Sequence, residues 1–304
     1  MNKQYNEDSI QSLGILGGVR AKPASIGLES HNHTFLEILG NSIDEYRAGF
    51  GNSITITKND DGSVTVRDFG RGVPMGKNKD GEYAYDKVFN TLWAGGKYKN
   101  NDDDGGDYEY SLGTNGVGAT GTNYTSDFLT VCSHKVEGTS FVKYEKGVEV
   151  EGSYQEVFRG KGEVDDDFIE LTLQDQSIVN GGLRFVFNND KIGESKEYYY
   201  ENGVADYIKS ISNEEHMLTD VISFTTEQKG RDNEADKDYR IKTDINFAFN
   251  RETSFSRYYH NTSWLENGGT PEEFIKNSFT FVIDKFLKEQ NLYNKNEKKV
   301  TFED

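Results

Sequence analysis

The sequence is short of cysteine, of long hydrophobic runs and of positive charge. Its single cysteine, Cys132, has no second thiol with which to form an internal disulfide. No apolar run reaches the roughly 20 residues that a membrane-spanning helix needs, and no signal-peptide pattern stands at the start. These absences predict a soluble protein of the cytoplasm, with no membrane partner.

Positive charge is scarce, because 34 lysines and arginines stand against 52 acidic residues and give a net charge of −18 at pH 7. A surface of this sign repels the phosphates of nucleic acid, which opposes wrapping of DNA around the whole protein. Any DNA contact should therefore be local or come from another chain.

The length and composition of the chain, with the patterns described below, predict a folded α+β protein. The chain has 304 residues, of which 34% are hydrophobic and 28% charged, and its core must use many of its 19 Phe and 18 Tyr. We expect an N-terminal arm over residues 1–30, a first domain over 31–162 and a second domain over 163–304.

The first strong pattern is a helix over residues 33–46, where Phe35, Leu39 and Ile43 recur every four residues. A β-hairpin that ends at Asp68 should follow. Further helices are expected over residues 85–93, 118–126, 168–179, 203–211 and 271–287, and strands over 128–132, 140–144, 148–154, 183–187 and 241–249. Residues 97–107 are rich in Asn, Asp and Gly, which is typical of a surface loop that can act as a lid.

The predicted helix over residues 33–46 also carries candidate chemistry. Glu37 and Asn41 lie one turn apart, so their side chains face the same way. A carboxylate can take a proton from an attacking water, and an amide oxygen can bind Mg²⁺. His33, one turn earlier, can orient Glu37. A polar helix face in contact with solvent explains the same spacing.

Two glycine motifs follow along the chain. Asp68 ends a predicted strand just before Gly70-Arg71-Gly72, where a carboxylate can accept from an exocyclic amine and the backbone can approach a flat ligand. Residues 113–118 (Gly-Thr-Asn-Gly-Val-Gly) precede a predicted helix, which suits phosphate binding by backbone N–H groups. Lys97 can neutralise phosphate charge. Ordinary turns and loops have similar composition, and neither the Rossmann nor the P-loop motif occurs.

The order of these motifs is more specific than any one of them. It runs Glu-x-x-x-Asn, Asp-x-Gly-x-Gly, Ala-Gly-Gly-Lys and Gly-x-x-Gly-x-Gly. This order resembles the GHKL ATPases, in particular the ATPase region of type IIA topoisomerase B subunits (DNA gyrase B or topoisomerase IV B), over residues 5–154. From residue 168 the resemblance is weaker, and Asn261 and Gly268-Gly269-Thr270 look like the transducer domain. That region disfavours a chaperone, mismatch-repair or histidine-kinase member.

The resemblance implies a GHKL (Bergerat) α/β sandwich with a mixed sheet, followed by a partial transducer domain similar to domain 2 of ribosomal protein S5. Glu37 would be the general base, with His33 assisting it, Asn41 would bind Mg²⁺ and Asp68 would read the adenine. Glu45 and Arg71 match a family ion pair. The remaining nucleotide-contacting positions that it implies are Gly72, Pro74, Lys97, Tyr108, Gly113, Asn115, Gly116, Val117 and Gly118, with Tyr5 of the arm reaching the nucleotide of the partner protomer.

The implied function is an ATP- and Mg²⁺-dependent module of a DNA topoisomerase, an isomerase of DNA topology. ATP would drive homodimerisation through the arm and the ATPase domain, and the full-length protein would act with a topoisomerase A subunit and DNA. The chain ends before the family's Gln-Thr-Lys loop, so a nucleotide-gated dimerisation clamp with little turnover is the alternative.

Several positions depart from the family pattern and indicate a divergent member. Gly40 stands where gyrase B usually has Asp, Asn115 where it has His, and Lys135 near a position that is often Arg. Residues 23–27 are one residue shorter than the usual motif. The strand expected after residue 162, whose Thr helps to complete the adenine pocket in relatives, is missing or unrecognisable in this sequence.

Overall fold

The computed structural model describes residues 12–94, 112–113, 116–136, 138–150, 158–159, 163–231, 239–252, 254–296 and 298–302. The chain divides into two compact units, Met1–Phe249 and Asn250–Asp304. Of the predicted features, the lid segment over residues 97–107 lies outside the described residues, as do Tyr5, Lys97, Tyr108 and Asn115.

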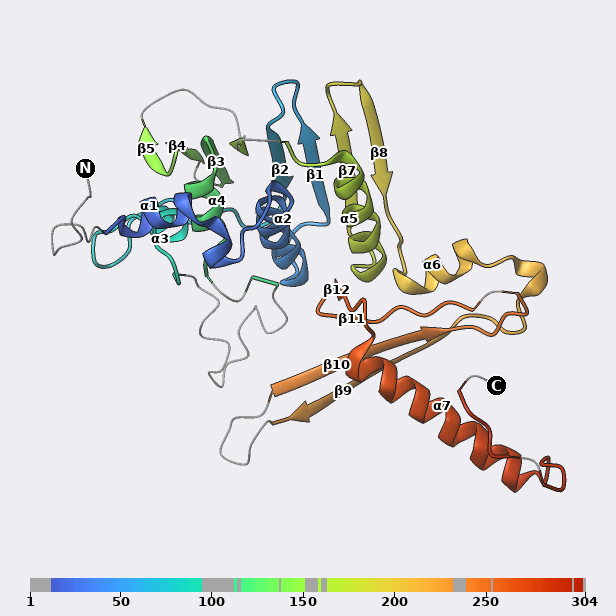
Figure 1. Cartoon of the computed structure of the whole chain (residues 1–304). Helices are drawn as coiled ribbons and strands as arrows, with labels where there is room; N and C mark the ends of the chain where they lie inside the picture. Colours follow the sequence, from blue (N-terminus) through green and yellow to red (C-terminus); the bar gives the residue numbers. More distant parts are fainter. Residues whose placement is uncertain are drawn as a thin grey trace, which may run out of the picture. The chain divides into compact units, whose positions relative to one another are not determined.

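An eight-stranded mixed sheet forms the centre of the first unit (Figure 1), in the order β5-β4-β3-β6-β2-β1-β7-β8. Only the β1–β7 pair is parallel, and the other neighbouring strands run antiparallel. The strands are β1 (Ser53–Lys58), β2 (Val64–Asp68), β3 (Phe128–Lys135), β4 (Gly138–Glu145), β5 (Val148–Val150), β6 (Phe158–Arg159), β7 (Arg184–Asn189) and β8 (Glu194–Tyr198). The α+β class that the sequence predicts is confirmed.

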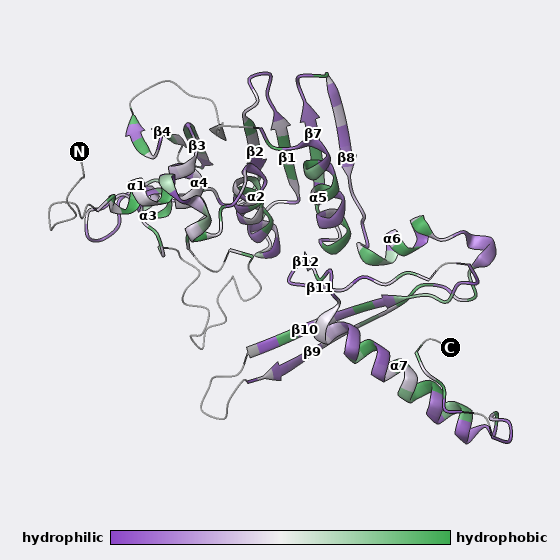
Figure 2. Ribbon diagram, viewed as in Figure 1, coloured by the Kyte–Doolittle hydropathy of each residue, from purple (hydrophilic) through white to green (hydrophobic). Residues whose placement is uncertain are grey.

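The core lies between this sheet and its helices. Ile54 and Ile56 of β1 are buried at every second residue, as a strand requires. They join one buried cluster with Phe35 and Leu39 of α2 (His31–Arg47) and with Leu173 of α5 (Asp166–Val179). Hydrophobic residues of β1, β7 and α5 are green in Figure 2. The apolar stripe predicted over residues 33–46 therefore does pack against the sheet.

The N-terminal segment differs from the arm and loop expected over residues 1–30. Residues Gly14–Ala21 form helix α1, and a 3₁₀ turn follows at Pro23–Ile26. Val19 packs in a small core cluster with Leu92 and Tyr124. The glycines of α1 lower its intrinsic helix propensity, and these tertiary contacts override that propensity. Residues after Leu13 therefore belong to the folded unit rather than to an arm.

Helices α3 (Ala84–Asn90) and α4 (Gly118–Thr125) complete this part of the unit. The guanidinium of Arg20, on α1, donates to the carbonyl oxygens of Tyr124 (2.6 Å) and Ser126 (3.2 Å) at the end of α4. Carbonyl groups at the C-terminus of a helix lack partners within the helix, and a cation there also meets the negative end of the dipole. Arg20 thus joins α1 to α4.

The sheet continues past residue 162, where the sequence predicts a domain boundary. Phe185 of β7 pairs with Ile54 of β1, and β8 extends the sheet beyond β7. Residues up to Tyr198 therefore lie in the same sheet as Asp68, and the boundary predicted after residue 162 is corrected because it falls inside that sheet. Residues 163–165 lead directly into α5 without a strand, as the sequence predicts.

The rest of the first unit consists of α6 (Val204–Ile211), a 3₁₀ turn at Glu214–His216, and the antiparallel pair β9 (Ile222–Gly230) and β10 (Tyr239–Phe247). Helix α6 and strand β10 agree with the predicted elements, whereas β8 and β9 are not predicted. No helix in the described part of the chain is long and apolar enough to cross a membrane.

The second unit contains the short pair β11 (Tyr259–His260) and β12 (Ser263–Trp264) and the long helix α7 (Gly269–Glu289). Asp284 of α7 accepts hydrogen bonds from Lys288 Nζ (2.8 Å) and Tyr293 Oη (2.9 Å). The Lys288 ammonium lowers the pKa of the Asp284 carboxyl. Tyr293 Oη in turn accepts from the Val300 N–H (3.0 Å), so the chain after α7 folds back onto the helix.

A buried lysine fixes the start of α5 to the sheet. Lys58, at the end of β1, is 5% exposed, and its Nζ donates to the Val164 carbonyl oxygen at 2.9 Å. It also forms ion pairs with Asp166 and, at 3.5 Å, with Glu163. Asn189 of β7 donates to the other oxygen of Asp166. Lys58 and Asp166 therefore link β1, β7 and the start of α5.

We expect Lys58→Met to lower the free energy of unfolding by about 1–3 kcal/mol, because a buried carbonyl loses its donor. Lys196→Met is the matched control, since the Lys196–Glu170 pair is exposed and should contribute less than about 1 kcal/mol. Urea unfolding followed by circular dichroism measures both values. Equal losses in the two variants would contradict the role given to Lys58.

Candidate functional site

Helix α2 carries most of the predicted site residues. It begins after Ser30, whose Oγ accepts from the His33 N–H at 3.4 Å. Its apolar stripe is buried, which sets the rotation of the helix and turns Glu37, Asn41 and Glu45 to a neighbouring face. Asn41 is exposed there and Glu37 is half-buried. The carboxylate and the amide therefore share one face, as their spacing predicts.

The Glu37 carboxylate lies at the N-terminus of α4. A Cβ placed on Gly118, the first residue of α4, would come within 1.9 Å of Glu37 Oε2, so a larger residue there would displace the Glu37 carboxylate. Helix N-termini offer free N–H groups and a positive dipole end, which favour negative charge. Glu37 and the glycine motif, about 80 residues apart in sequence, are thus brought into contact.

His33 lies one turn before Glu37 on the same helix. Its Nδ1 accepts a hydrogen bond from the Glu29 N–H at 3.1 Å, so a neutral ring carries its proton on Nε2. The ring is fixed by this bond, with Nε2 as its donor. The orienting role of His33 toward Glu37 stays a prediction.

Asp68 ends β2 and is held by two donors. Its Oδ2 accepts from Ser42 Oγ (2.9 Å), which comes from the buried side of α2, and its Oδ1 accepts from the Gly70 N–H (2.8 Å). Each carboxylate oxygen can accept a second hydrogen bond. Asp68 is therefore a fixed acceptor at the end of a strand, as the recognition of an exocyclic amine requires.

The predicted ion pair between Glu45 and Arg71 is present. Arg71 Nε and Nη2 each lie 3.0 Å from a Glu45 oxygen, and the Arg71 N–H also donates to Glu45 Oε2 at 3.0 Å. Such bidentate pairs have a defined geometry. The Arg71 guanidinium also lies over the Phe50 ring, 4.1 Å from its centre. The loop after β2 is thus fixed to α2.

The same loop is fixed to β3 at Gly72. Gly72 has a φ of +72°, and a Cβ there would lie 2.5 Å from Ser133 Oγ. That hydroxyl donates to the Val73 carbonyl oxygen at 2.8 Å. Pro74, which follows Val73, is exposed. Close backbone approach at Gly72 is a structural requirement here, as the motif predicts.

Asp44 holds the start of the glycine motif, and sequence reasoning missed it. This carboxylate is 2% exposed, and its two oxygens accept from the N–H groups of Leu112 (2.7 Å) and Gly113 (3.1 Å). A buried carboxylate needs such donors. Gly40 lies one turn earlier, and a Cβ there would lie 3.8 Å from the Leu112 side chain. The sequence does carry a signal for this contact. Gly40 and Asp44 stand one helical turn apart, and a glycine beside an acidic residue indicates that another segment packs on this face of α2.

The other end of the glycine motif is fixed as well. The Gly116 carbonyl oxygen accepts from the Trp93 N–H at 2.8 Å, and Gly116 has a φ of +61°. Val117 packs against the small cluster around Val19 and then α4 begins at Gly118. Both ends of the segment 113–118 are therefore held in place, the first by α2 and the second by the residues that follow α3.

The described site residues lie on and around α2, at the end of the interior strand β2 and at the start of α4 (Figure 1). Among the described residues no group of three His, Cys, Asp or Glu side chains could hold a metal ion. A single amide oxygen, that of Asn41, still fits Mg²⁺, since this ion is usually held by one or two side chains together with substrate phosphates.

A mixed sheet with helices over its core, a Glu-x-x-x-Asn helix, a strand-end Asp and a glycine motif before a helix define the class of GHKL ATPases. Two solved structures share this fold. One is the 43K ATPase domain of Thermus thermophilus gyrase B in complex with an aminocoumarin, with a TM-score of 0.68 and 24% identity over 93% of this chain and 75% of that one. The other is the topoisomerase IV ATP-binding domain of Francisella tularensis, with a TM-score of 0.65 and 20% identity over 93% and 77%.

Proteins that are similar in sequence indicate which family within this class the chain resembles. The B subunit of DNA topoisomerase 4 from Staphylococcus aureus is 30% identical over 319 residues, which cover 96% of this chain and 46% of that protein. A family model described as DNA gyrase B matches residues 203–304. The chain belongs to the type IIA DNA topoisomerase B subunits and corresponds to their ATPase region. It spans about half the length, 46%, of the curated relatives it matches.

We expect Asp44→Asn to release the start of the glycine motif. One of two charge-assisted hydrogen bonds, each contributing about 1.5–3 kcal/mol, is lost, so the amides of Leu112 and Gly113 should exchange with solvent about tenfold faster or more. Hydrogen exchange followed by NMR measures this. Asp60→Asn, in the exposed hairpin turn, is the control. Unchanged exchange at both amides in Asp44→Asn would refute the anchoring role.

Proposed function

We propose that this chain binds ATP with Mg²⁺ and hydrolyses it as the ATPase module of a type II DNA topoisomerase. The observation that carries the proposal is the contact between Glu37 and the first residue of α4, because it joins the candidate general base to the candidate phosphate site. Membership of the topoisomerase B family supports the choice of nucleotide and of parent enzyme.

The adenine end of the nucleotide is assigned to Asp68. Its carboxylate accepts from the exocyclic amine of the base, while Ser42 and the Gly70 N–H keep it in place. Arg71, held by Glu45, forms a wall of the base pocket beside Gly72 and Pro74. A carboxylate acceptor favours adenine over guanine, which presents a carbonyl oxygen at the corresponding position.

The phosphate end is assigned to residues 113–118 and the start of α4. Backbone N–H groups and the helix dipole bind the phosphates there. Asp44 and Trp93 hold the two ends of this segment in position. Lys97 and Tyr108 add contacts from the lid positions, Asn115 from the loop itself, and Tyr5 from the arm of a partner protomer.

Hydrolysis needs a base beside the terminal phosphate. Glu37 takes the proton of a water molecule as that water attacks the γ-phosphorus, and the bond to the leaving ADP oxygen breaks. His33 donates from Nε2 to orient Glu37. Asn41 supplies one oxygen ligand to Mg²⁺, which when bound neutralises charge that develops on the phosphate oxygens.

Binding of ATP between two protomers would drive dimerisation, and the full-length protein would use it in the cytoplasm to pass one DNA duplex through another with a topoisomerase A subunit. The net charge of −18 fits a module that leaves most DNA contacts to other parts of the assembly. The competing proposal is a clamp that dimerises on ATP with little turnover.

We expect Glu37→Gln to reduce ATP hydrolysis by about 10²–10⁴-fold, the usual contribution of a general base, and to keep ATP affinity within about threefold. Phosphate release measures turnover, and calorimetry with a non-hydrolysable ATP analogue measures binding. Glu194→Gln, on the edge strand β8, is the control and should match the wild type.

The ATPase proposal and the clamp proposal are distinguished by the rate at which the wild type releases phosphate from ATP. Turnover that Glu37→Gln abolishes supports the ATPase. Analogue-dependent dimers in analytical ultracentrifugation, with the same background phosphate release from wild type and Glu37→Gln, would leave only the clamp. Absence of ATP binding by the wild type would refute both.

A further inference from the structure

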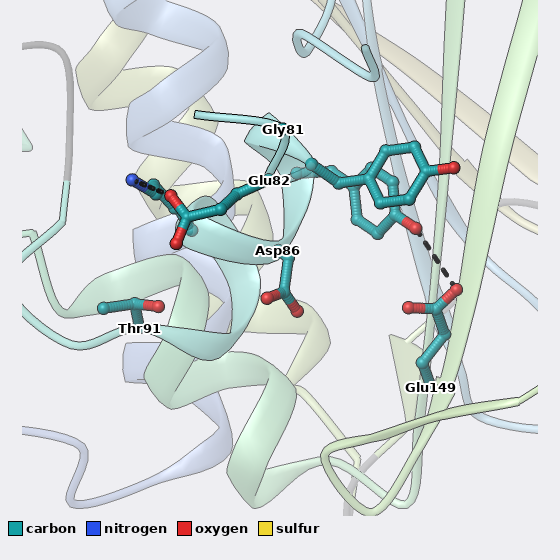
Figure 3. Close-up of a pocket in the computed structure, with 8 residues that line it drawn as sticks. Gly81, Glu82, Asp86, Thr91 and Glu149 are labelled. Atoms are coloured by element: carbon teal, nitrogen blue, oxygen red, sulfur yellow. Dashed lines mark hydrogen bonds and ion pairs between the residues drawn. The ribbon is translucent and has the colours of Figure 1, made fainter. Parts of the chain in front are cut away.

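A surface pocket of about 510 Å³ opens in the first unit between α3 and the edge strand β5 (Figure 3). Its lining includes Glu82, Tyr83, Tyr85, Asp86, Lys87 and Glu149. None of the predicted nucleotide-site residues that the structure describes lines it. The pocket is therefore separate from the site described above, and its lining side chains are available for another ligand.

Two tyrosine rings form one wall. The rings of Tyr83 and Tyr85 are stacked with their centres 5.0 Å apart, and Tyr85 Oη donates to Glu149 Oε1 at 3.3 Å. Burial, followed by the Glu149 charge, raises the pKa of the Tyr85 hydroxyl. Tyr83 is 45% exposed, and Lys77 Nζ already lies 4.9 Å from its ring centre. The wall offers aromatic surface of the kind that attracts cations.

The pocket has an excess of negative charge. Glu82 is paired with Lys87 at 2.6 Å, so these two charges cancel. Asp86 accepts only from the neutral amide of Asn90 (2.6 Å), and Glu149 only from the neutral Tyr85 hydroxyl, among the described residues. Neither carboxylate has a cationic partner in that part of the chain. Two negative charges therefore face the pocket without compensation, which favours a cationic ligand.

A buried hydroxyl group on the same face of the sheet as Glu149 lacks a partner among the described residues. Tyr144 of β4 is 0% exposed, and its Oη has no hydrogen-bond partner in the described part of the chain. Tyr144 is paired in register with Glu149, so both side chains lie on the same face of the sheet. Burial, followed by the charges of Glu149 and Asp86, raises the pKa of the Tyr144 hydroxyl. Tyr144 is not among the residues that line the pocket, so the ligand contacts argued below do not include it.

The edge of the sheet beside the pocket can pair with another chain. In the order of the strands β5 is outermost, and it is hydrogen-bonded only to β4 among the described residues. The free edge of a strand can accept an extended peptide as one more strand. The residue of that peptide opposite Glu149 would put its side chain on the face of Glu149, which is the face of the pocket.

We propose that β5 and this pocket form a docking site for an extended segment of a partner protein that carries an arginine opposite Glu149. Arginine fits better than lysine, because its planar guanidinium stacks on tyrosine rings and has five N–H donors for the two carboxylates. The backbone of the segment pairs with β5, and the arginine supplies the missing positive charge.

The probe is a fluorescein-labelled peptide, Thr-Val-Arg-Val-Thr, capped at its C-terminus with an amide, and its binding to the full chain is measured by anisotropy. We expect Glu149→Gln to weaken binding about tenfold or more. Glu194→Gln, a matched exposed glutamate on β8 at the other edge of the same sheet, should change it less than about twofold. Thermal unfolding checks that both variants remain folded.

Two further peptides test the two parts of the proposal. Replacement of the central arginine by glutamate, and N-methylation of the two residues beside it, should each weaken binding about tenfold or more. Absence of binding by the wild type, equal binding of the arginine and glutamate peptides, or unchanged binding by Glu149→Gln would overturn the proposal. Glu37→Gln should bind the peptide like the wild type, so failure of the proposed ATPase would not affect this result.

Discussion

The burial of the apolar stripe of α2 against the sheet is the constraint on which the candidate site depends. Phe35, Leu39 and Ile43 are at most 1% exposed, and each contributes about 1.5–3 kcal/mol on transfer from water. Because these side chains can point only toward the sheet, the rotation of the helix is fixed. Every polar residue used at the site then has a defined direction: Glu37 toward α4, Ser42 toward Asp68 and Glu45 toward Arg71.

Much of this arrangement can be predicted from local patterns. The period of four in α2 and the period of two in β1 arise from burial on one side, and the structure confirms both. Strands β8 and β9 give no such signal because most of their residues are exposed, so they lack a clear alternation of buried and exposed positions. Helix α1 is not predictable locally because its stability comes from contacts with residues about 70 to 110 positions away.

The remaining errors concern long-range pairing. The boundary predicted after residue 162 is wrong because the parallel pairing of β7 with β1 leaves no local signal in either strand. The role of Asp44 is hidden for a similar reason, since its partners Leu112 and Gly113 lie 68 and 69 residues away along the chain. The spacing of residues in α2 predicts the face on which Glu37 lies. Its contact with Gly118 cannot be predicted from spacing, because the fold brings these two residues together. The roles of Lys97, Tyr108, Asn115 and Tyr5 stay predictions.

Strand β6 lies between two parts of the large sheet. On one side lie β3, β4 and β5, and on the other β2, β1, β7 and β8. Among the described residues, β6 pairs with one residue of β2 and with two residues of β3. A side-chain link also joins the two sides, because Ser133 Oγ on β3 donates to the Val73 carbonyl oxygen in the loop after β2. Asp68 ends β2 and Ser133 lies on β3, so the short loop from Asp68 to Val73 ties together two strands that stand on opposite sides of β6.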